Sequence, residues 1–340
     1  MLEKEHPLVI VDVGASGGVD KGWETLPANA RILAFEPDEA ECRRLTEAVS
    51  ASGERRVEYI PKALGDLSGR RPFYLTASPY CASTFRPIEN LASRFDGLSG
   101  MLIEEVIEVD LTTLDEWCDA RDITTVDYIK LDTQGSELDI IRGGRDVLSS
   151  SLVIETEVEF NPLYLDQPLF GQIDAYLRAA GFTFWGFENM HFCSARGSDL
   201  GPIRLAHRGS GIAFPARRPG GQLMWAQAFF VRDELLTGNP HPKLTKQRER
   251  AILLARARGL DDLAQTLEHL LGWPISRDAP DKATSGAPQN MRELRAELTQ
   301  VREELDAIRT SRSYRWTRPL RFLGSRFGRI RPSKPAPDGS

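Results

Sequence analysis

The stretch Val9-Ile-Val-Asp-Val-Gly-Ala-Ser-Gly-Gly18, followed by Ile32-Leu-Ala-Phe-Glu-Pro37, decides the fold class of this chain. The first segment is a short apolar run that ends in glycines, which is typical of a buried parallel strand that turns tightly into a helix. The second is another apolar run, which ends in the acid Glu36 and is stopped by Pro37. In a strand–helix–strand unit such an acid lies beside the glycine turn, where it accepts hydrogen bonds from ribose hydroxyls. The pattern therefore predicts an α/β sheet that holds a nucleoside-containing cofactor.

The spacing of the glycines separates two classes of cofactor. The dinucleotide fingerprint Gly-x-Gly-x-x-Gly lets the backbone approach a pyrophosphate. Here the glycines are Gly14, Gly17 and Gly18, and Ser16 stands where that fingerprint requires its second glycine. Asp12 precedes the turn, and a carboxylate there is unfavourable beside a pyrophosphate but acceptable near an ammonium or sulfonium group. These residues favour S-adenosylmethionine over NAD. The alternative is a glycine turn that only packs a helix on the sheet.

A third region carries a resemblance to a known family. The segment Tyr128-Ile-Lys-Leu-Asp-Thr-Gln-Gly-Ser-Glu-Leu-Asp139, followed by Ile140-Ile-Arg-Gly-Gly144, resembles the signature of the FkbM family of S-adenosylmethionine-dependent methyltransferases. Three other segments agree in the same order: Asp12-Val-Gly-Ala-Ser-Gly-Gly18, Lys62-Ala-Leu-Gly-Asp66, and Glu155-Thr-Glu-Val-Glu-Phe-Asn-Pro-Leu-Tyr164 with Gln167-Pro168. The similarity covers roughly residues 7 to 235. The family more often carries Asn at the position of Ser16 and Glu at the position of Gln134.

The resemblance implies a Rossmann-like sheet of seven strands with helices on both faces and the last strand antiparallel. Alternating apolar runs predict strands near 8–13, 31–35, 57–63, 126–131, 152–158, 182–187 and 225–231. Helices are expected near 38–52, 111–121, 136–148 and 168–180. A turn at 66–69 predicts a hairpin addition over 71–76. In such a sheet the ligands bind at the carboxyl ends of the strands.

The sequence pattern changes after residue 235, where the predicted methyltransferase domain (1–235) ends. Residues 236–271 form a predicted helical extension, a hairpin broken near Gly259, and residues 272–290 are rich in linker residues. In the predicted helix 291–310 apolar residues recur at spacings of 3, 4, 3, 4 and 3, which is a short heptad seam. We expect a coiled coil with another copy or a partner protein; the alternative is an amphipathic helix docked on its own domain.

Residues 311–340 form a basic, aromatic tail, which is similar to the tails that follow coiled coils in some bacterial polysaccharide-assembly proteins. From Arg309 onward the chain has nine Lys or Arg and one acid, whereas the whole chain has a net charge of −6. Arginines interleaved with Tyr314, Trp316 and Phe322 suit an anionic membrane surface. A solvated tail without a partner is the alternative. The remainder of the chain is acidic, which argues against a nucleic-acid partner.

Composition limits the remaining possibilities. A chain of 340 residues with 41% hydrophobic residues can bury a large core, and its apolar runs are shorter than the ~20 residues that a membrane span requires. The amino terminus carries no signal-peptide pattern. Four scattered cysteines, without a Cys-x-x-Cys pair, predict reduced thiols. We expect a cytoplasmic protein that contacts the inner face of the membrane through its basic tail.

Six residues are predicted to bind the cofactor. The glycine turn, Gly14 to Gly18 with Ser16 and Gly17, would let the backbone approach the methionine portion of S-adenosylmethionine, and Asp12 would lie near its cationic groups. Glu36 would bind the ribose. Asp66, in the segment Lys62-Ala-Leu-Gly-Asp66, would reach the adenine amine, although the same residue begins a turn and would then only cap it.

Four residues are candidates for catalysis. Asp132 ends a central strand, with Lys130 two residues earlier on the same face, and would orient or deprotonate a substrate hydroxyl. Its alternative role is capping of the next helix. Glu155, Glu157 and Glu159 share one strand face, which is costly unless they are paired or reach the mouth of the site, and we place Glu157 at the acceptor. These acids offer oxygen ligands for a divalent metal, but the pattern is not specific. His191 is a candidate base or a solvated loop residue.

These residues predict an O-methyltransferase that uses S-adenosylmethionine and acts on a hydroxyl of a sugar, a glycan precursor or a related secondary metabolite. Two alternatives stay open. One is an NAD-dependent oxidoreductase, which the missing glycine disfavours. The other is a non-catalytic module of the same fold that its coiled coil recruits to a glycan-assembly complex.

Overall fold

A central sheet of seven strands organises the computed structural model, which describes residues 7–198, 203–204, 217–218, 220–238 and 241–272. The strand order is β3-β2-β1-β7-β8-β12-β9, and β12 runs antiparallel to both of its neighbours. The strands are β1 (Val9–Val13), β2 (Arg31–Phe35), β3 (Val57–Ile60), β7 (Tyr128–Leu131), β8 (Val153–Glu159), β9 (Phe182–Cys193) and β12 (Gln222–Arg232). The predicted seven-stranded α/β fold with an antiparallel last strand is therefore confirmed.

The remaining elements are short strands and helices. The helices are α1 (Glu39–Ser52), α2 (Leu91–Arg94), α3 (Leu114–Asp119), α4 (Glu137–Arg142), α5 (Arg145–Leu148), α6 (Phe170–Ala179), α7 (Pro242–Ala257) and α8 (Asp261–Leu270), with 3-10 helices η2 (Lys21–Thr25), η3 (Pro79–Cys81), η4 (Ser99–Met101) and η5 (Asp233–Leu236). The short strands are β4 (Ala63–Leu64), β5 (Gly69–Thr76), β6 (Ile103–Thr112), β10 (Ile203–Arg204) and β11 (Arg217–Arg218). The predicted coiled coil (291–310), the tail (311–340) and all of the linker after Gly272 lie outside the described residues.

Several predicted boundaries differ from the observed ones for local physical reasons. Strand β3 ends at Ile60, because Pro61 has no N–H to continue the ladder. The helix predicted over 136–148 is divided at Gly143 and Gly144 into α4 and α5. Gly143 packs on the Gly65 carbonyl oxygen, which a Cβ at Gly143 would approach to 2.1 Å. The segment after the glycine turn contains only the 3-10 helix η2, and the helix predicted from residue 111 begins at Leu114, after the unpredicted strand β6.

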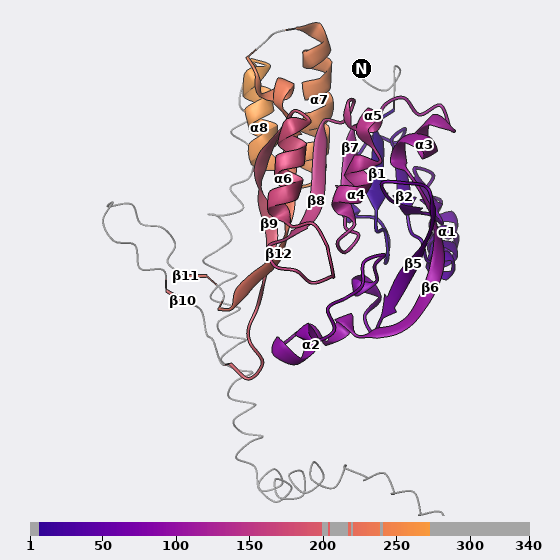
Figure 1. The fold of residues 1–340 in the computed structure, drawn as a ribbon. Coiled ribbons are helices and arrows are strands. Elements are labelled where there is room, and N and C mark those ends of the chain that lie inside the picture. The colour runs from indigo at the N-terminus through magenta and orange to yellow at the C-terminus, as the bar shows by residue number, and fades with distance from the viewer. Residues whose placement is uncertain (1–6, 199–202, 205–216, 219, 239–240, 273–340) are drawn as a thin grey trace, which may run out of the picture. The chain divides into compact units, whose positions relative to one another are not determined.

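One face of the central sheet is covered by α3, α4, α5 and α6, which lie close to the strands along the chain (Figure 1). Alternate residues of the strands point into this layer, and most of them are apolar along the whole length of each strand. They include Val9, Val11 and Val13 of β1, Ile129 and Leu131 of β7, and Ile154 and Val158 of β8. The aromatic rings of Phe35 and Trp117 meet edge to face there, with centroids 4.9 Å apart. This layer is an ordinary apolar core.

The opposite face is covered by η2 and by the helical pair α7 and α8, which come from the far end of the described chain. Their buried residues include Trp23 of η2 and Ala251, Leu254 and Leu263 of the pair. Figure 1 shows α7 and α8 beside β8 and β9. The sequence predicted this helical hairpin over 243–271, and the chain turns between the two helices at Gly259, whose φ is +73°. The predicted domain boundaries themselves stay predictions.

A second, three-stranded sheet (β4-β6-β5) extends from the carboxyl ends of the central strands as a curved arm, visible beside α1 in Figure 1. Its inner side packs Phe73, Val109 and Leu111 together. A strand, β5, occurs where the hairpin addition over 71–76 was predicted, but the predicted hairpin is wrong: β5 pairs with β6, which lies between β5 and β4 in this sheet, and β3 pairs with β2. The arm matters because the segment that links β5 to β6 forms one wall of the cavity described below.

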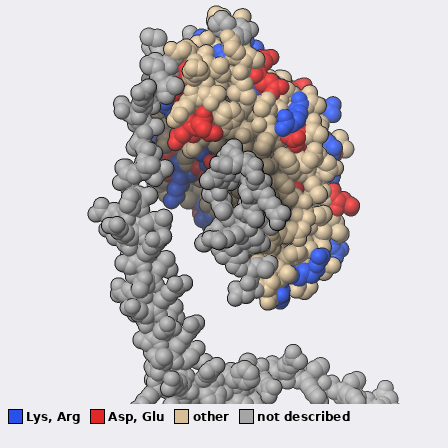
Figure 2. All heavy atoms as spheres, turned by 90° about the vertical axis from the view of Figure 1, so that its left-hand side faces the viewer, with Lys and Arg blue, Asp and Glu red and all other residues tan. Residues whose placement is uncertain are grey.

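The described surface and the helices add two observations. On the face drawn in Figure 2, acidic and basic side chains lie interspersed among uncharged ones. Within the described residues, every helix is too short or too polar to cross a membrane. All four cysteines are free thiols, as the scattered spacing predicted.

Candidate active site

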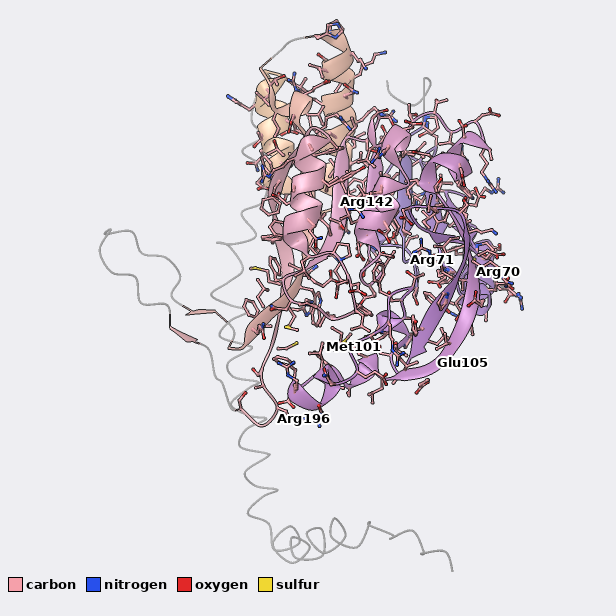
Figure 3. The ribbon with its side chains drawn as sticks, in the orientation of Figure 1. Arg70, Arg71, Met101, Glu105, Arg142 and Arg196 are labelled. Atoms are coloured by element: carbon pink, nitrogen blue, oxygen red, sulfur yellow. The ribbon has the colours of Figure 1, made fainter. Side chains whose placement is uncertain are left out.

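A cavity of about 880 Å³ lies at the carboxyl ends of the central strands, between the glycine turn and the curved arm. Its near part is lined by Gly14, Ser16, Gly17, Glu36 and Leu64. Its middle is lined by Lys130, Asp132, Gln134 and Glu157. Its far part is lined by Tyr80, Leu98, Met101, Tyr164 and Trp225. Met101 is labelled in Figure 3, where it lies in the segment between α2 and β6. Most of the predicted site residues therefore share one cavity.

The glycine turn brings the ends of β1 and β7 together. Gly14 has a φ of +82°, and a Cβ on it would lie 1.9 Å from the Asp132 carbonyl oxygen, so no larger residue fits. The N–H groups of Gly14 and Ala15 both donate to the Phe35 carbonyl oxygen at the end of β2, each at 3.1 Å. The turn thus joins the three strand ends at which the cavity begins.

Glu36 follows β2 and is buried with its carboxyl group at the cavity wall. The N–H of Asp38 donates to its Oε1 at 2.9 Å. Burial raises the pKa of Glu36, the Asp38 N–H opposes the rise and the charges of Asp38 and Glu41 add to it, with a net pKa of about 7. The carboxylate therefore lacks the solvation or the cationic partner that would stabilise its charge, and a ligand that donates hydrogen bonds would supply it.

Asp12 and Lys130 form a buried ion pair, with Nζ of Lys130 3.0 Å from Oδ1 of Asp12. Burial by itself would lower the pKa of Lys130, but the carboxylates of Asp12, Asp132 and Glu155 raise it above its usual range. Lys130 is therefore a cation at the cavity wall. Asp12 is fully buried behind it and is not among the cavity-lining residues that the structure describes. The predicted contact between Asp12 and the cofactor stays a prediction.

Gln134 links the two acids of the middle part, although the sequence analysis gave it no role. Its Nε2 donates to Oδ1 of Asp132 at 3.1 Å and to Oε2 of Glu157 at 2.6 Å. Its Oε1 accepts a hydrogen bond from the hydroxyl of Tyr164 at 2.9 Å. The backbone of Gln134 is left-handed (φ +61°), and its carbonyl oxygen accepts from Ser83 Oγ at 2.7 Å. Every polar atom of this amide is thus used to hold the two carboxyl groups in place.

The three glutamates of β8 differ in their hydrogen-bond partners and in their surroundings. Glu155 accepts hydrogen bonds from Arg258 and from the Tyr128 hydroxyl. Glu157 lines the cavity, and burial together with the charges of Asp132 and Glu159 raises its pKa well above the usual range. Glu159 is buried, neither of its oxygens has a hydrogen-bond partner among the described residues, and burial likewise raises its pKa. Glu155 is thus paired with a cation, whereas burial raises the pKa of both Glu157 and Glu159.

Besides Asp12, two predicted site residues lie away from the cavity wall. Asp66 is paired with Arg71 of β5, labelled in Figure 3, at 2.9 Å, and Leu64, two residues earlier, is the residue that reaches the cavity. His191 lies in β9, which is longer than predicted, and its ring stacks on that of Trp225 at 4.7 Å. Neither belongs to the cavity-lining residues in the described part of the chain. No group of three or more metal-ligating side chains occurs among the described residues.

The methyltransferase FkbM domain model matches residues 12–184 of this chain. The chain belongs to this family. The 2-O-methyltransferase NoeI of Sinorhizobium fredii (strain NBRC 101917 / NGR234) is 30% identical over 179 residues, which are 49% of this chain and 69% of that protein. The resemblance seen in the sequence is therefore confirmed. The matched residues include the glycine turn, Glu36, Asp132 and Glu157, whereas α7 and α8 follow the matched segment.

Solved structures with a related arrangement include the FkbM methyltransferase of Methylobacillus flagellatus KT, with a TM-score of 0.37 and 14% identity. That similarity covers 66% of this chain and 43% of the Methylobacillus protein, so the chain spans less than half of that protein. The magnesium protoporphyrin IX methyltransferase of Synechocystis PCC 6803, determined with bound S-adenosylmethionine, has a TM-score of 0.33 and 10% identity over 66% of this chain and 70% of that one.

Proposed function

We propose that this protein transfers a methyl group from S-adenosylmethionine to a hydroxyl oxygen of a sugar, a glycan precursor or a related secondary metabolite. The observation that carries the proposal is one continuous cavity that joins the glycine turn and Glu36 to Asp132 and Glu157. The relative NoeI bears the name of a 2-O-methyltransferase, which supports oxygen as the acceptor atom.

The near part of the cavity fits the nucleoside portion of the donor. Glu36 is a buried acceptor at the end of β2, where a ribose would present two hydroxyl donors. The glycine turn has positive φ at Gly14, Gly17 and Gly18, which leaves its backbone free of side chains on the cavity side. Leu64 and Phe73 supply an apolar wall for a flat base. These residue types suit S-adenosylmethionine better than a pyrophosphate.

The middle of the cavity suits proton removal. When bound, S-adenosylmethionine supplies an electrophilic methyl carbon on a sulfonium. Asp132 accepts the proton of the acceptor hydroxyl as the new carbon–oxygen bond forms and the carbon–sulfur bond breaks. Gln134 holds Oδ1 of Asp132, and Oδ2 is the oxygen that we assign to the hydroxyl. Glu157 keeps its own proton and serves as a hydrogen-bond donor to the acceptor.

The far part of the cavity fits a sugar. Tyr80, Tyr164 and Trp225 give it aromatic walls, and His191 stacks behind Trp225 and fixes the plane of its ring. Aromatic faces bind the apolar C–H faces of sugar rings, while buried carboxyl and amide groups bind hydroxyls. Both kinds of group occur here within one cavity.

The first test is calorimetry of the purified protein with S-adenosylmethionine, S-adenosylhomocysteine and NAD. Binding of the first two and not of NAD supports the proposal, whereas the reverse points to an oxidoreductase. A panel of sugars and lipid-linked glycan precursors is then screened for formation of S-adenosylhomocysteine. Asp132→Asn should remove turnover while cofactor affinity stays unchanged, because the amide cannot accept the proton.

We also propose that residues 291–340 act outside the reaction, through self-association or a partner protein and through contact of a cytoplasmic protein with the inner membrane surface. Deletion of these residues should alter oligomeric state or membrane retention and spare methyl transfer. Loss of turnover in a truncated protein that remains folded would show that this segment takes part in catalysis.

A further inference from the structure

The first helix of the pair α7–α8 is followed by Arg258, which pairs with a residue of the cavity wall, Asp20. Arg258 follows α7, and Gly259, with φ of +73°, turns the chain into α8. Its guanidinium group is mostly buried, with 12% of the side chain exposed. This helical pair lies after the segment that the family model matches, residues 12–184. Its contribution to the site therefore comes from outside the shared domain.

Arg258 binds two carboxylates, one on the central sheet and one in the segment that precedes η2. Its Nε and Nη2 donate to the two oxygens of Glu155 on β8, at 2.8 and 2.7 Å. Its Nη1 lies 2.6 Å from Oδ2 of Asp20, in the segment between the glycine turn and η2. One guanidinium group thus ties that segment to the middle of the sheet through a bidentate pair and a third contact.

The segment that Arg258 holds is itself part of the cavity. Asp20 lines the cavity and caps η2, because the Gly22 N–H donates to its Oδ1 at 2.7 Å. The end of α7 presses on the same turn, since a Cβ on Gly22 would lie 2.0 Å from the Ala257 carbonyl oxygen. The guanidinium carbon of Arg258 lies over the Trp23 ring, 5.3 Å from the centroid of that ring. Three contacts therefore hold this segment: the ion pair of Asp20 with Arg258, the close approach of Gly22 to the end of α7, and the packing of the Trp23 ring on Arg258.

We propose that α7–α8 completes the donor site, with Arg258 acting as a positioning residue that holds Asp20 and thereby the glycine turn Gly14–Gly18 in the conformation that binds the nucleoside cofactor. This inference rests on the proposed use of S-adenosylmethionine. It adds a functional part of the chain that lies beyond the family domain.

Hydrogen bonds hold the glycine turn itself: the Gly17 N–H donates to Oε1 of Glu41 at 3.0 Å, and the Gly18 N–H donates to the Ala15 carbonyl oxygen at 2.9 Å. The segment that leads from this turn into the short 3-10 helix η2 is the part that Arg258 fixes, through its ion pair with Asp20. A ligand that binds one of several conformations loses apparent affinity in proportion to the population of that conformation. Burial alone would raise the pKa of Asp20, but the Gly22 N–H and the Arg258 charge lower it, so the ion pair persists at neutral pH.

The test compares S-adenosylhomocysteine affinity, measured by calorimetry, with hydrogen exchange over residues 14–22 in the full chain. Asp20→Ser keeps a side-chain oxygen to cap η2 but cannot reach Arg258. We expect affinity to fall by about tenfold and exchange of the protected Gly14, Ala15 and Gly18 amides to quicken. Unchanged exchange in Asp20→Ser overturns the proposal.

A matched control separates positioning from a general loss of stability. Arg256→Ala breaks a neighbouring ion pair, between Arg256 of α7 and Glu268 of α8, that does not contact the glycine segment in the described structure. It should leave affinity and exchange over residues 14–22 unchanged. If Arg256→Ala weakens binding as much as Asp20→Ser, the effect is general destabilisation and the proposal fails.

A second variant addresses Arg258 itself, whose removal alone would strand the buried Glu155. The double variant Arg258→Met/Glu155→Gln removes both charges and keeps their volume. We expect it to weaken binding as Asp20→Ser does, and the addition of Asp20→Ser to it should have no further effect. A full additional loss would mean that Asp20 acts on the ligand directly, which contradicts the assignment of Arg258. Failure of the wild-type protein to bind S-adenosylhomocysteine would instead overturn the proposed function, and the exchange data would then decide the positioning role alone.

Discussion

The two faces of the central sheet differ in the polarity of the residues that the same strands place on them. On the face under α3 to α6, the residues of β1 and β7 stay apolar to the carboxyl ends of the strands, and β8 places a single buried hydroxyl there, Thr156, between Ile154 and Val158. On the other face each strand begins apolar and becomes charged toward the same end. The series are Leu8, Ile10 and Asp12 in β1, Tyr128, Lys130 and Asp132 in β7, and Val153, Glu155, Glu157 and Glu159 in β8.

This difference in polarity shows on which face of the sheet buried charge is located. The apolar face derives its stability from packing, and its cover comes from helices next to the strands along the chain. The ion pairs of Asp12 with Lys130 and of Glu155 with Arg258 stabilise the charged face, and burial raises the pKa of Glu157, which favours its neutral form. Both cations come from distant segments, 118 and 103 residues along the chain from the acids with which they pair. The face that carries the candidate chemistry is thus the one that depends most on tertiary contacts.

The largest expected effect breaks a pair on the charged face. Lys130→Met leaves the Asp12 carboxylate buried without its cation, so we expect the free energy of unfolding to fall by about 3–5 kcal/mol. Urea unfolding measures this loss. The second change Asp12→Asn should restore most of it, and no restoration would mean that Lys130 contributes through its packing.

On the apolar face, Ile154→Ala should destabilise the protein by about 2–5 kcal/mol because it leaves a cavity at a fully buried position. Affinity for S-adenosylhomocysteine should not change in the folded fraction. The same calorimetric titration used for the charged face measures it. A change in affinity would show that packing on the apolar face affects ligand binding on the charged face, which contradicts the independence of the two faces.

Glu36→Ala tests the donor end of the charged face. We expect S-adenosylhomocysteine to bind more weakly by about 1–3 kcal/mol, because the ribose hydroxyls lose a charged acceptor. The free energy of unfolding should stay the same or rise, since Glu36 has no cationic partner among the described residues that the change would strand. Equal affinities of the variant and the wild type would remove Glu36 from the site.

The raised pKa of Glu36 predicts a pH dependence with a defined sign. Its pKa lies at about 7 in the folded protein against 4.5 for the free group, so the folded state holds the proton more tightly. The stability from this group is complete below the unfolded pKa and is lost as the pH rises through about 7. Ligand hydroxyls favour the ionised form, so affinity should drop by up to about tenfold per pH unit below this pKa. Glu36→Gln should flatten both profiles, and an unchanged slope would contradict the assignment.

The smallest expected effect is that of Glu157→Gln. Because burial raises the pKa of Glu157 and so favours its neutral form, the neutral amide is close to it in shape and charge, and we expect a change in unfolding free energy below about 1 kcal/mol. Turnover should also be largely retained, in contrast to its loss in Asp132→Asn. A large loss of turnover in Glu157→Gln would identify Glu157 as the base and exchange the roles of the two acids.

The parts of the fold that could be predicted are those fixed by neighbouring residues. Alternating or continuous apolar runs located all seven central strands, and the glycines at 14, 17 and 18 located the turn, because strand periodicity and positive φ are local properties. The acid Glu36 could be placed at the cavity for the same reason, since the end of a parallel strand always reaches that edge.

What escaped prediction depended on which distant segments meet. Strand β6 was missed although its second half, Ile107 to Leu111, alternates apolar and acidic residues as a half-buried strand does, because the predicted helix from residue 111 overlapped its end. Gln134 gained its role only when Tyr164 and Glu157 were brought to it. Asp66 and His191 looked well placed along the chain, but Arg71 pairs with the first and Trp225 stacks on the second.

The sequence by itself determined the alternation of strands and helices and the glycine turn, because these follow from short-range patterns of apolar residues, glycines and strand-ending acids. The resemblance to the FkbM family supplied the seven-stranded sheet with its antiparallel last strand. The tertiary structure alone decided which buried acids carry charge. Lys130 neutralises Asp12 from 118 residues away, and Arg258 neutralises Glu155 from 103 residues away. The ionisation of a carboxyl group depends on the solvent and charges around it in space, and the chain order does not contain that information.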